Sequence, residues 1–249
     1  MSHFRDIGFD VERKEDIMCL FSEVRGLSRK QEFGKYIQYI TDDGSGARLY
    51  WYFRKGNLFR KEEFLGITPA FQGSTSQHIR DPEFKPNQEW PLEPSLDLWI
   101  NNSETNEEYP LIVDVVNYLE VQNKDFTKLS NIKATLFANT FEYYQTEEEF
   151  WKQYPKKNYV HVPAPGMFIP TGTFSPNDNQ NFKSHAECWC YGKVIKSQKL
   201  VNQITKNEFY HFVMETYAAN YDIVTQIKGT IDLKQVTIIG GIFWPCAIL

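Results

Sequence analysis

The segment Ala186-Glu-Cys-Trp-Cys-Tyr-Gly-Lys-Val-Ile195 alternates between two kinds of side chain without a break. Every second residue is small or apolar, as expected of a β-strand with one face in a core. The chain ends on a still more apolar segment, Val236-Thr-Ile-Ile-Gly-Gly-Ile-Phe-Trp-Pro-Cys-Ala-Ile-Leu249. We expect this end to be tied into a sheet, because a frayed end would expose large apolar side chains to water. The last third of the chain therefore predicts a β-rich core that forms only once residues 236–249 are in place.

Length and composition describe a globular protein of one large domain or two ordinary ones. The chain has 249 residues, and its aromatic content of 16% favours β-structure with large buried side chains. Its longest apolar runs fall far short of the roughly 20 residues that span a bilayer, and the first residues lack a signal peptide. A net charge of −5 argues against a nucleic-acid partner. We therefore expect a cytoplasmic protein that binds neither membrane nor nucleic acid, with its four cysteines reduced.

Residues 1–72 predict a β-α-β-β-β region. A helix over residues 14–24 carries one apolar stripe, acidic residues in its first turn and Gly26 after its last. The strands of the region are expected over residues 4–11, 35–41 and 47–54, with one more ending near Pro69. The polar run Asp42-Asp-Gly-Ser-Gly46 predicts a tight turn between two of them.

Residues 73–130 are expected to be a Pro-rich, irregular connecting segment. Four prolines fall within 13 positions and interrupt any regular period: Pro82, Pro86, Pro91 and Pro94. Apolar residues such as Trp90, Leu96 and Trp99 lie among them, so we expect the segment to pack on a domain surface.

Residues 131–249 predict a β-rich C-terminal domain. Residues 134–144 form a strong strand pattern, and Thr146-Glu-Glu-Glu149 is a capping box that begins a short helix. Residues 205–217 fit either a helix or a hairpin that turns at Lys206-Asn207, and the β-rich neighbours favour the hairpin. The strand-then-acidic-helix order of 134–154 repeats that of the first region, so an internal duplication stays open. Overall the sequence predicts an α+β fold, mainly antiparallel β-sheet with a few short helices.

Three short motifs resemble an uncharacterised bacterial protein family. They are the opening Met1-Ser-His-Phe-x-x-Ile-Gly-Phe9, the turn Asp43-Gly-Ser-Gly-Ala47 and the terminal Gly241-x-Phe-Trp244. The likeness also covers Phe174-Ser-Pro176 and residues 205–224, and it departs at Pro245-Cys-Ala247, where the family pattern has a short polar run. It implies a fold shared with bacterial homologues and no known chemistry. The last third also resembles an OB-type barrel, with about five strands, interior glycines and aromatic faces.

The histidines and cysteines predict packing rather than chemistry. His185, Cys188 and Cys190 are zinc-ligand types, but on a strand His185 points opposite to the two cysteines. The face of Cys188 and Cys190 also holds Ala186 and Val194, so we expect buried thiols and no metal. None of the five histidines lies in a nucleophile motif, and no phosphate-binding glycine loop is present. We assign no catalytic residue and no cofactor.

The clearest candidate binding site is the strand Arg48-Leu-Tyr-Trp-Tyr-Phe-Arg54. Alternation gives it one apolar face and one face of Arg48, Tyr50, Tyr52 and Arg54. Arginine and tyrosine dominate binding hot spots and stack on rings, so this face could anchor a protein partner. The alternative is an ordinary solvated face of an antiparallel sheet.

Two functions are consistent with these patterns. The first is a non-catalytic cytoplasmic binding protein with a protein partner, acting as bacterial immunity proteins do when they block a target. The alternative is a small-molecule-binding domain or enzyme built from duplicated β-α-β-β-β units, with its ligand between them. A concave pocket with convergent polar groups would favour the alternative, and a flat aromatic patch would favour the first.

Overall fold

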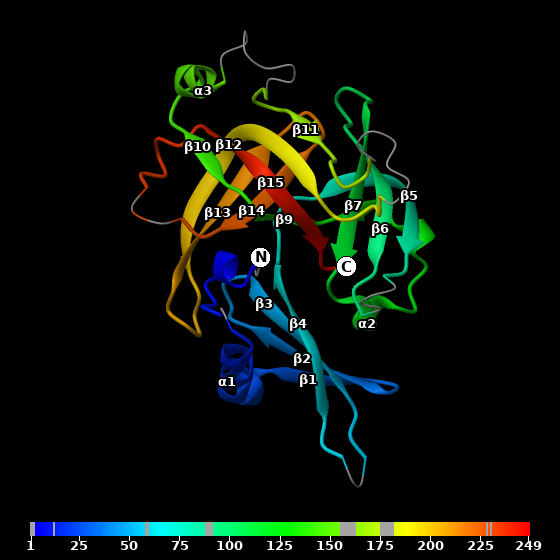
Figure 1. The fold of residues 1–249 in the computed structure, drawn as a ribbon. Helices are drawn as coiled ribbons and strands as arrows, with labels where there is room; N and C mark the ends of the chain where they lie inside the picture. The colour runs from blue at the N-terminus through cyan, green and yellow to red at the C-terminus, as the bar shows by residue number, and fades with distance from the viewer. Residues whose placement is uncertain are drawn as a thin grey trace.

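The computed structural model describes residues 3–11, 13–57, 60–87, 92–154, 163–174, 182–227, 229 and 231–249 (Figure 1). It is an α+β fold in which a four-stranded sheet packs below a large mixed sheet that is partly curled into a barrel. Short helices lie at the periphery. The predicted fold class is therefore confirmed. Within the described residues, every helix is too short or too polar to cross a membrane.

The N-terminal sheet is an antiparallel meander in the order β1-β2-β3-β4. Its strands are β1 (Arg29–Phe33), β2 (Tyr36–Asp42), β3 (Ala47–Arg54) and β4 (Glu63–Phe71). They follow the helical elements η1 (Arg5–Ile7), α1 (Lys14–Val24) and η2 (Arg25–Leu27). Helix α1 covers one face, where Phe21 lies 4.9 Å from the Trp51 ring and 4.7 Å from the Phe53 ring. On the opposite face, the Tyr52 hydroxyl donates to the carbonyl oxygen of Val116 at 2.5 Å. Both faces of β3 are therefore core.

Five strands form a ring that is compatible with the predicted barrel, although one of them, β9, comes from before the last third of the chain. They are β9 (Ala134–Ala138), β12 (Cys188–Val201), β13 (Glu208–Glu215), β14 (Asn220–Thr225) and β15 (Ile238–Ala247). Long, curved β12 closes the ring, because its first half pairs with β15 and its second half with β13 (Figure 1). Strands β14 and β9 pair in parallel, and the other pairs of the ring are antiparallel. The barrel interior holds Cys188, Cys190, Phe212, Tyr221 and Phe243, all fully buried.

The segment 73–130 is more regular than predicted. It holds three antiparallel strands, a short helix and a 3-10 turn: β5 (Gln77–Lys85), β6 (Ser95–Asn101), β7 (Glu108–Val115), α2 (Tyr118–Val121) and η3 (Phe126–Lys128). Strand β7 joins the barrel by pairing in parallel with β15, and β8 (Asn131–Ile132) pairs with β5. The prediction was wrong because Pro82 lies at the register break between Arg80 and Glu83, where a strand can hold a proline without losing a ladder hydrogen bond. Trp90 and Pro91 lie outside the described residues.

Residues 4–11, predicted as a strand, form the 3-10 turn η1 and an irregular stretch instead. Their carbonyl groups are satisfied by side chains of the turn after β12. Asn202 Nδ2 donates to the Ile7 oxygen at 2.8 Å, and Thr205 Oγ1 donates to the Gly8 oxygen at 2.7 Å. The apolar side chains of the segment are buried as the alternation suggested, but no strand ladder is needed to hold them. Helix α1 and strand β3, in contrast, have the predicted bounds.

The strand predicted over 134–144 is two strands, β9 and β10 (Glu142–Tyr144). After them Thr146 caps α3 (Glu147–Gln153), accepting from the Glu149 amide at 3.1 Å. The prediction of a hairpin at Lys206 is confirmed, since β12 and β13 are joined there and Lys206 has φ +63°. Short β11 (Phe168–Ile169) pairs with the start of β12. The strands of residues 134–154 pair into the barrel instead of forming a meander, so the two regions proposed as a duplication differ in topology.

Candidate functional site

The predicted face of β3 is not an open surface. Tyr50 and Tyr52 are 1% and 0% exposed, because residues after β7 and the C-terminal residues cover them. Arg54 lies at the far end of the strand, half exposed, and pairs with Glu63 at 2.9 Å. Only Arg48 and Tyr50 come together at a site. The prediction of which side chains share each face of β3 was correct, but alternation along one strand cannot reveal what packs against its polar face.

Arg48 and Tyr50 line a cavity of about 620 Å³, which we name the Arg48 pocket. It opens between the N-terminal sheet, α2 and the C-terminal residues. Its polar lining is Arg29 from β1, Asp42 from β2, Arg48 and Tyr50 from β3, and Asn117, Glu120 and Lys124 from α2 and its flanks. Leu27 lies at the pocket with its side chain largely exposed. The pocket thus joins segments more than 60 residues apart, which explains why sequence patterns found only two of its members.

Two ion pairs fix the guanidinium groups of the Arg48 pocket. Arg48 Nε donates to Asp42 Oδ2 at 2.7 Å and its Nη1 donates to Gln72 at 2.9 Å. Arg29 Nη2 donates to Glu120 Oε1 at 2.8 Å. Burial, and after it the negative charge of Glu120, raises the pKa of Tyr50 to about 12. Tyr50 is therefore a neutral phenol at physiological pH, able to donate a hydrogen bond.

Asn117 ties the end of the chain to the Arg48 pocket, which Asn117 and Leu249 both line. The amide of Asn117 is bonded at both ends to the backbone of Leu249, with Nδ2 donating to its oxygen at 2.8 Å and Oδ1 accepting from its nitrogen at 2.9 Å. Asn117 is 3% exposed. Three cationic residues, Arg29, Arg48 and Lys124, thus line one cavity with two acids, Asp42 and Glu120, and the excess of cationic groups suits an anion.

A second polar cluster, missed at the level of sequence, lies between β13, β14 and the β4–β5 loop. His211 Nε2 lies 2.7 Å from Asp222 Oδ1, and Gln198 Nε2 lies 2.8 Å from His211 Nδ1. Asp222 also accepts from the backbone and hydroxyl groups of Ser74 and Thr75, at 2.7–2.8 Å. The hydroxyl groups point at the carboxylate and not at the imidazole, so this is no hydrolase triad. It fastens the loop to the barrel.

A further, part-buried network anchors α3. The hydroxyl groups of Tyr144, Tyr154 and Tyr191 all donate to Oε2 of Glu142, at 2.6, 2.7 and 2.8 Å. The ring of Phe150 packs against Tyr144 and Tyr191 at 5.1 and 5.4 Å. The hydroxyl groups of these three tyrosines are all hydrogen-bonded, so the network holds α3 in place.

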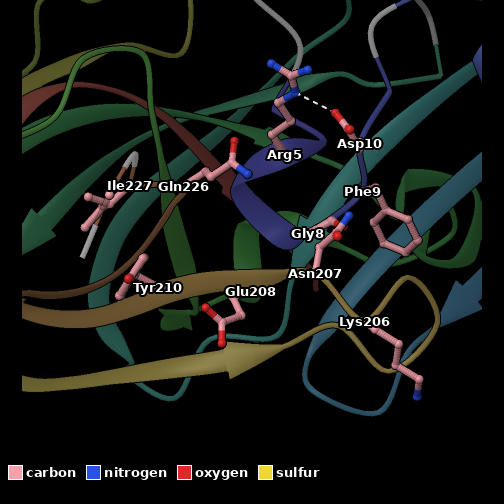
Figure 2. A pocket seen from close by; sticks show the side chains of 11 residues that line it. Arg5, Gly8, Phe9, Asp10, Lys206, Asn207, Glu208, Tyr210, Gln226 and Ile227 are labelled. Atoms are coloured by element: carbon pink, nitrogen blue, oxygen red, sulfur yellow. Dashed lines mark hydrogen bonds and ion pairs between the residues drawn. The ribbon is translucent and has the colours of Figure 1, made fainter. Parts of the chain in front are cut away.

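A second cavity, of about 390 Å³, lies where the N-terminal segment meets the β12–β13 turn (Figure 2). Figure 2 shows Arg5 and Asp10 turned toward each other, while Lys206 extends away from them. Arg5 Nε donates to Asp10 Oδ1 at 2.8 Å. Glu208 lines the same cavity but pairs with Lys199 at 2.9 Å. Its charged groups do not converge on one point, so this cavity is a weaker candidate than the Arg48 pocket.

The prediction of buried thiols is confirmed, since Cys188 and Cys190 are both 0% exposed inside the barrel. Burial raises the pKa of the Cys190 thiol well above its ordinary value. His185 lies apart from them with a half-exposed ring. Among the described residues, no three His, Cys, Asp or Glu side chains gather at metal-binding distances.

No protein-family model, no curated protein and no solved structure matches the chain. The resemblance of its termini to a bacterial family therefore stays a prediction, and the candidate site is judged on its geometry.

Proposed function

We propose that the protein is a non-catalytic, cytoplasmic binding protein that receives a carboxylate group of a protein partner in the Arg48 pocket. The observation that carries the proposal is that Arg29, Arg48 and Lys124 line one cavity together with Tyr50. Arginine binds carboxylates through paired, charge-assisted hydrogen bonds, and a neutral phenol beside it can donate one more.

The ion pairs already present do not block such a ligand. The Arg29 side chain is 62% exposed, although its partner Glu120 is only 20% exposed. A partner carboxylate can therefore approach the exposed side of the Arg29 guanidinium while Arg29 stays paired with Glu120. Asp42 and Glu120 act in the free protein as supports that keep both guanidinium groups at the cavity wall.

Charge distribution favours an acidic partner. Residues 25–63, which form most of the N-terminal sheet, hold nine Lys or Arg and five Asp or Glu, although the whole chain has a net charge of −5. The sheet is thus a locally positive end on an acidic protein, and such a patch steers an acidic surface toward the pocket. The exposed side chain of Leu27 beside the pocket adds apolar contact area.

One form of this function is to block the partner, as bacterial immunity proteins do. The alternative, an enzyme or small-molecule domain made from duplicated units, loses its main support because the two regions have different topologies. Nucleic acid is a poor partner for a chain with a net charge of −5.

The test compares two arginines of the same strand. Proteins are captured from the native cell on wild-type protein, on Arg48→Gln and on Arg54→Gln, which removes an exposed arginine outside the pocket. A partner of the pocket is retained by the wild type and by Arg54→Gln, and its Kd rises about tenfold or more with Arg48→Gln. Melting temperatures show that both variants are folded. Equal effects of the two substitutions would reject the Arg48 pocket as the binding site.

A further inference from the structure

Strand β1 forms an open edge of the N-terminal sheet. It is the first strand in the order β1-β2-β3-β4, so within the described chain only β2 pairs with it. Figure 1 shows β1 below β2, on the side away from the barrel. The other edge strand, β4, is buried over its last four residues, and the strands that end the large sheet, β8 and β11, have two residues each. Strand β1 is therefore an accessible edge that a further strand can join.

The hydrogen bonds of the sheet show which backbone groups of β1 point outward. The Lys55 nitrogen donates to the Lys35 oxygen at 2.9 Å, in the register of the β2–β3 ladder, so the odd-numbered residues of β2 bond to β3. Bonding direction alternates along an antiparallel strand, so the even-numbered residues of β2 bond to residues 29, 31 and 33 of β1. The N–H and C=O groups of Lys30 and Glu32 therefore point away from β2. No backbone group among the described residues bonds to them.

The charges of β1 are placed symmetrically about Gln31. Lys30 precedes it and Glu32 follows it, with 3.4 Å between Nζ and Oε1 and with side chains 42% and 51% exposed. If two β1 strands pair antiparallel about a two-fold axis at Gln31, Lys30 of each copy lies opposite Glu32 of the other. The outward backbone groups of these same residues then bond across the axis. Registers centred on Lys30 or on Glu32 would instead place like charges opposite each other, which destabilises a strand pair.

We propose that the protein forms a transient symmetric dimer in which β1 pairs antiparallel with β1 of a second copy, centred on Gln31. Charged edges normally prevent such pairing because like charges meet, but here the charges are complementary. The same register places Phe33 of the second copy opposite Arg29, whose side chain lines the Arg48 pocket. The pairing does not depend on carboxylate binding in that pocket.

The first test measures self-association of the full chain by analytical ultracentrifugation at 0.1 M salt, up to a concentration of about 0.5 mM. We expect a monomer–dimer equilibrium with a Kd of about 0.1 mM, since the paired edge is much smaller than a standard interface. Arg48→Gln, which changes the Arg48 pocket, leaves this Kd unchanged, so the two proposals fail separately. A chain that stays monomeric at about 0.5 mM would overturn the dimer.

Exchanging the charges tests the register. Lys30→Glu and Glu32→Lys each place like charges opposite across the axis, so each raises the Kd about tenfold or more. A mixture of the two variants associates as the wild type does, because opposite charges face each other again between unlike chains. Melting temperatures show that both variants are folded. Unchanged self-association of either variant, or no association in the mixture, would overturn the proposal.

Cysteine cross-linking tests the position of the axis. The background is Cys19→Ser, which lacks the exposed thiol, while the other three cysteines are buried. Gln31→Cys forms a disulfide-linked dimer on mild oxidation, because two copies of this position face each other with Cα atoms about 4.5 Å apart. Arg29→Cys is the control, since its two copies are offset along the paired strands. Equal cross-linking of the two variants would contradict the register.

Discussion

Asp222 shows how a buried carboxylate is kept ionised by the residues around it. It is 0% exposed and accepts hydrogen bonds from His211, Ser74 and Thr75. Burial alone would raise its pKa, but these bonds together lower it to about 2, from an ordinary value of 3.8. Because the folded pKa is the lower one, the stabilisation is fully present above pH of about 4 and is lost as the pH falls toward 2.

This carboxylate gives a prediction with a defined pH window. The pKa shift corresponds to about 2 kcal/mol of folding free energy. Asp222→Asn should lower the unfolding free energy at pH 7 by about 2–4 kcal/mol, because amide hydrogens would face the backbone and hydroxyl donors of the loop. The difference from the wild type should shrink by about 2 kcal/mol between pH 5 and pH 2 in urea titrations. Exposed Glu83→Gln is the control. A difference that does not change with pH would show that Asp222 is not the charged group described here.

At the scale of elements, the close packing of the N-terminal segment against the β12–β13 turn depends on one glycine, Gly8. Gly8 has φ +81°, and a Cβ built on it would lie 2.7 Å from the Cβ of Asn202, whose amide holds this segment. Gly44 has a matching φ of +82° but nothing within 4 Å of the same position. The two glycines therefore separate backbone strain from steric clash.

Alanine substitutions at Gly44 and Gly8 should measure the cost of backbone strain and the added cost of the steric clash. Gly44→Ala should cost about 1 kcal/mol of unfolding free energy for the left-handed backbone alone. Gly8→Ala should cost about 2 kcal/mol more, because the N-terminal segment must move away from the β12–β13 turn. Chemical denaturation of both variants measures the difference. Equal costs would mean that the segment is not held tightly at this turn.

The same elements show which parts of the fold could be predicted from local sequence patterns and which could not. Helix α1 and strand β3 were predicted correctly, because an apolar stripe or a strict alternation runs between clear turn signals. Residues 4–11 also alternate, but their polar partners are side chains near residue 202, which no local pattern can indicate. Strand β5 was missed because a bulge lets it carry Pro82.

The residues of the candidate site could likewise be predicted only in part. Arg48 and Tyr50 could be named from one strand, while Arg29, Glu120 and Lys124 join them only through the packing of three elements. Tyr52 was assigned to the same open face and is buried, since the carbonyl of Val116 lies over its hydroxyl. Burial of a polar face depends on what the rest of the chain places on it, and that is a property of the tertiary structure.

At the scale of the whole molecule, the N-terminal sheet and the barrel share one core. Phe71 of β4 lies 6.1 Å from Phe209 and 5.0 Å from His211, both on barrel strand β13. The buried cluster that contains Trp51 also includes Phe137 and Val224 of the barrel. We therefore expect a single cooperative unfolding transition, with tryptophan fluorescence and far-ultraviolet circular dichroism changing together. Two separate transitions, or a folded fragment 1–72, would show that the regions are independent.

The shared core also leaves the Arg48 pocket at an edge of the contact between the two parts, where its cationic groups reach solvent.

The central claim is that this pocket binds a carboxylate, and NMR can test it without any partner. The Nε–H signals of Arg29, Arg48 and Arg54 are followed while N-acetylglutamate is added, with N-acetylglutamine as the neutral control. The account predicts that Arg29 and Arg48 shift and saturate with the glutamate derivative only, while Arg54 stays still. No shift at Arg48, or an equal shift at Arg54, would contradict it.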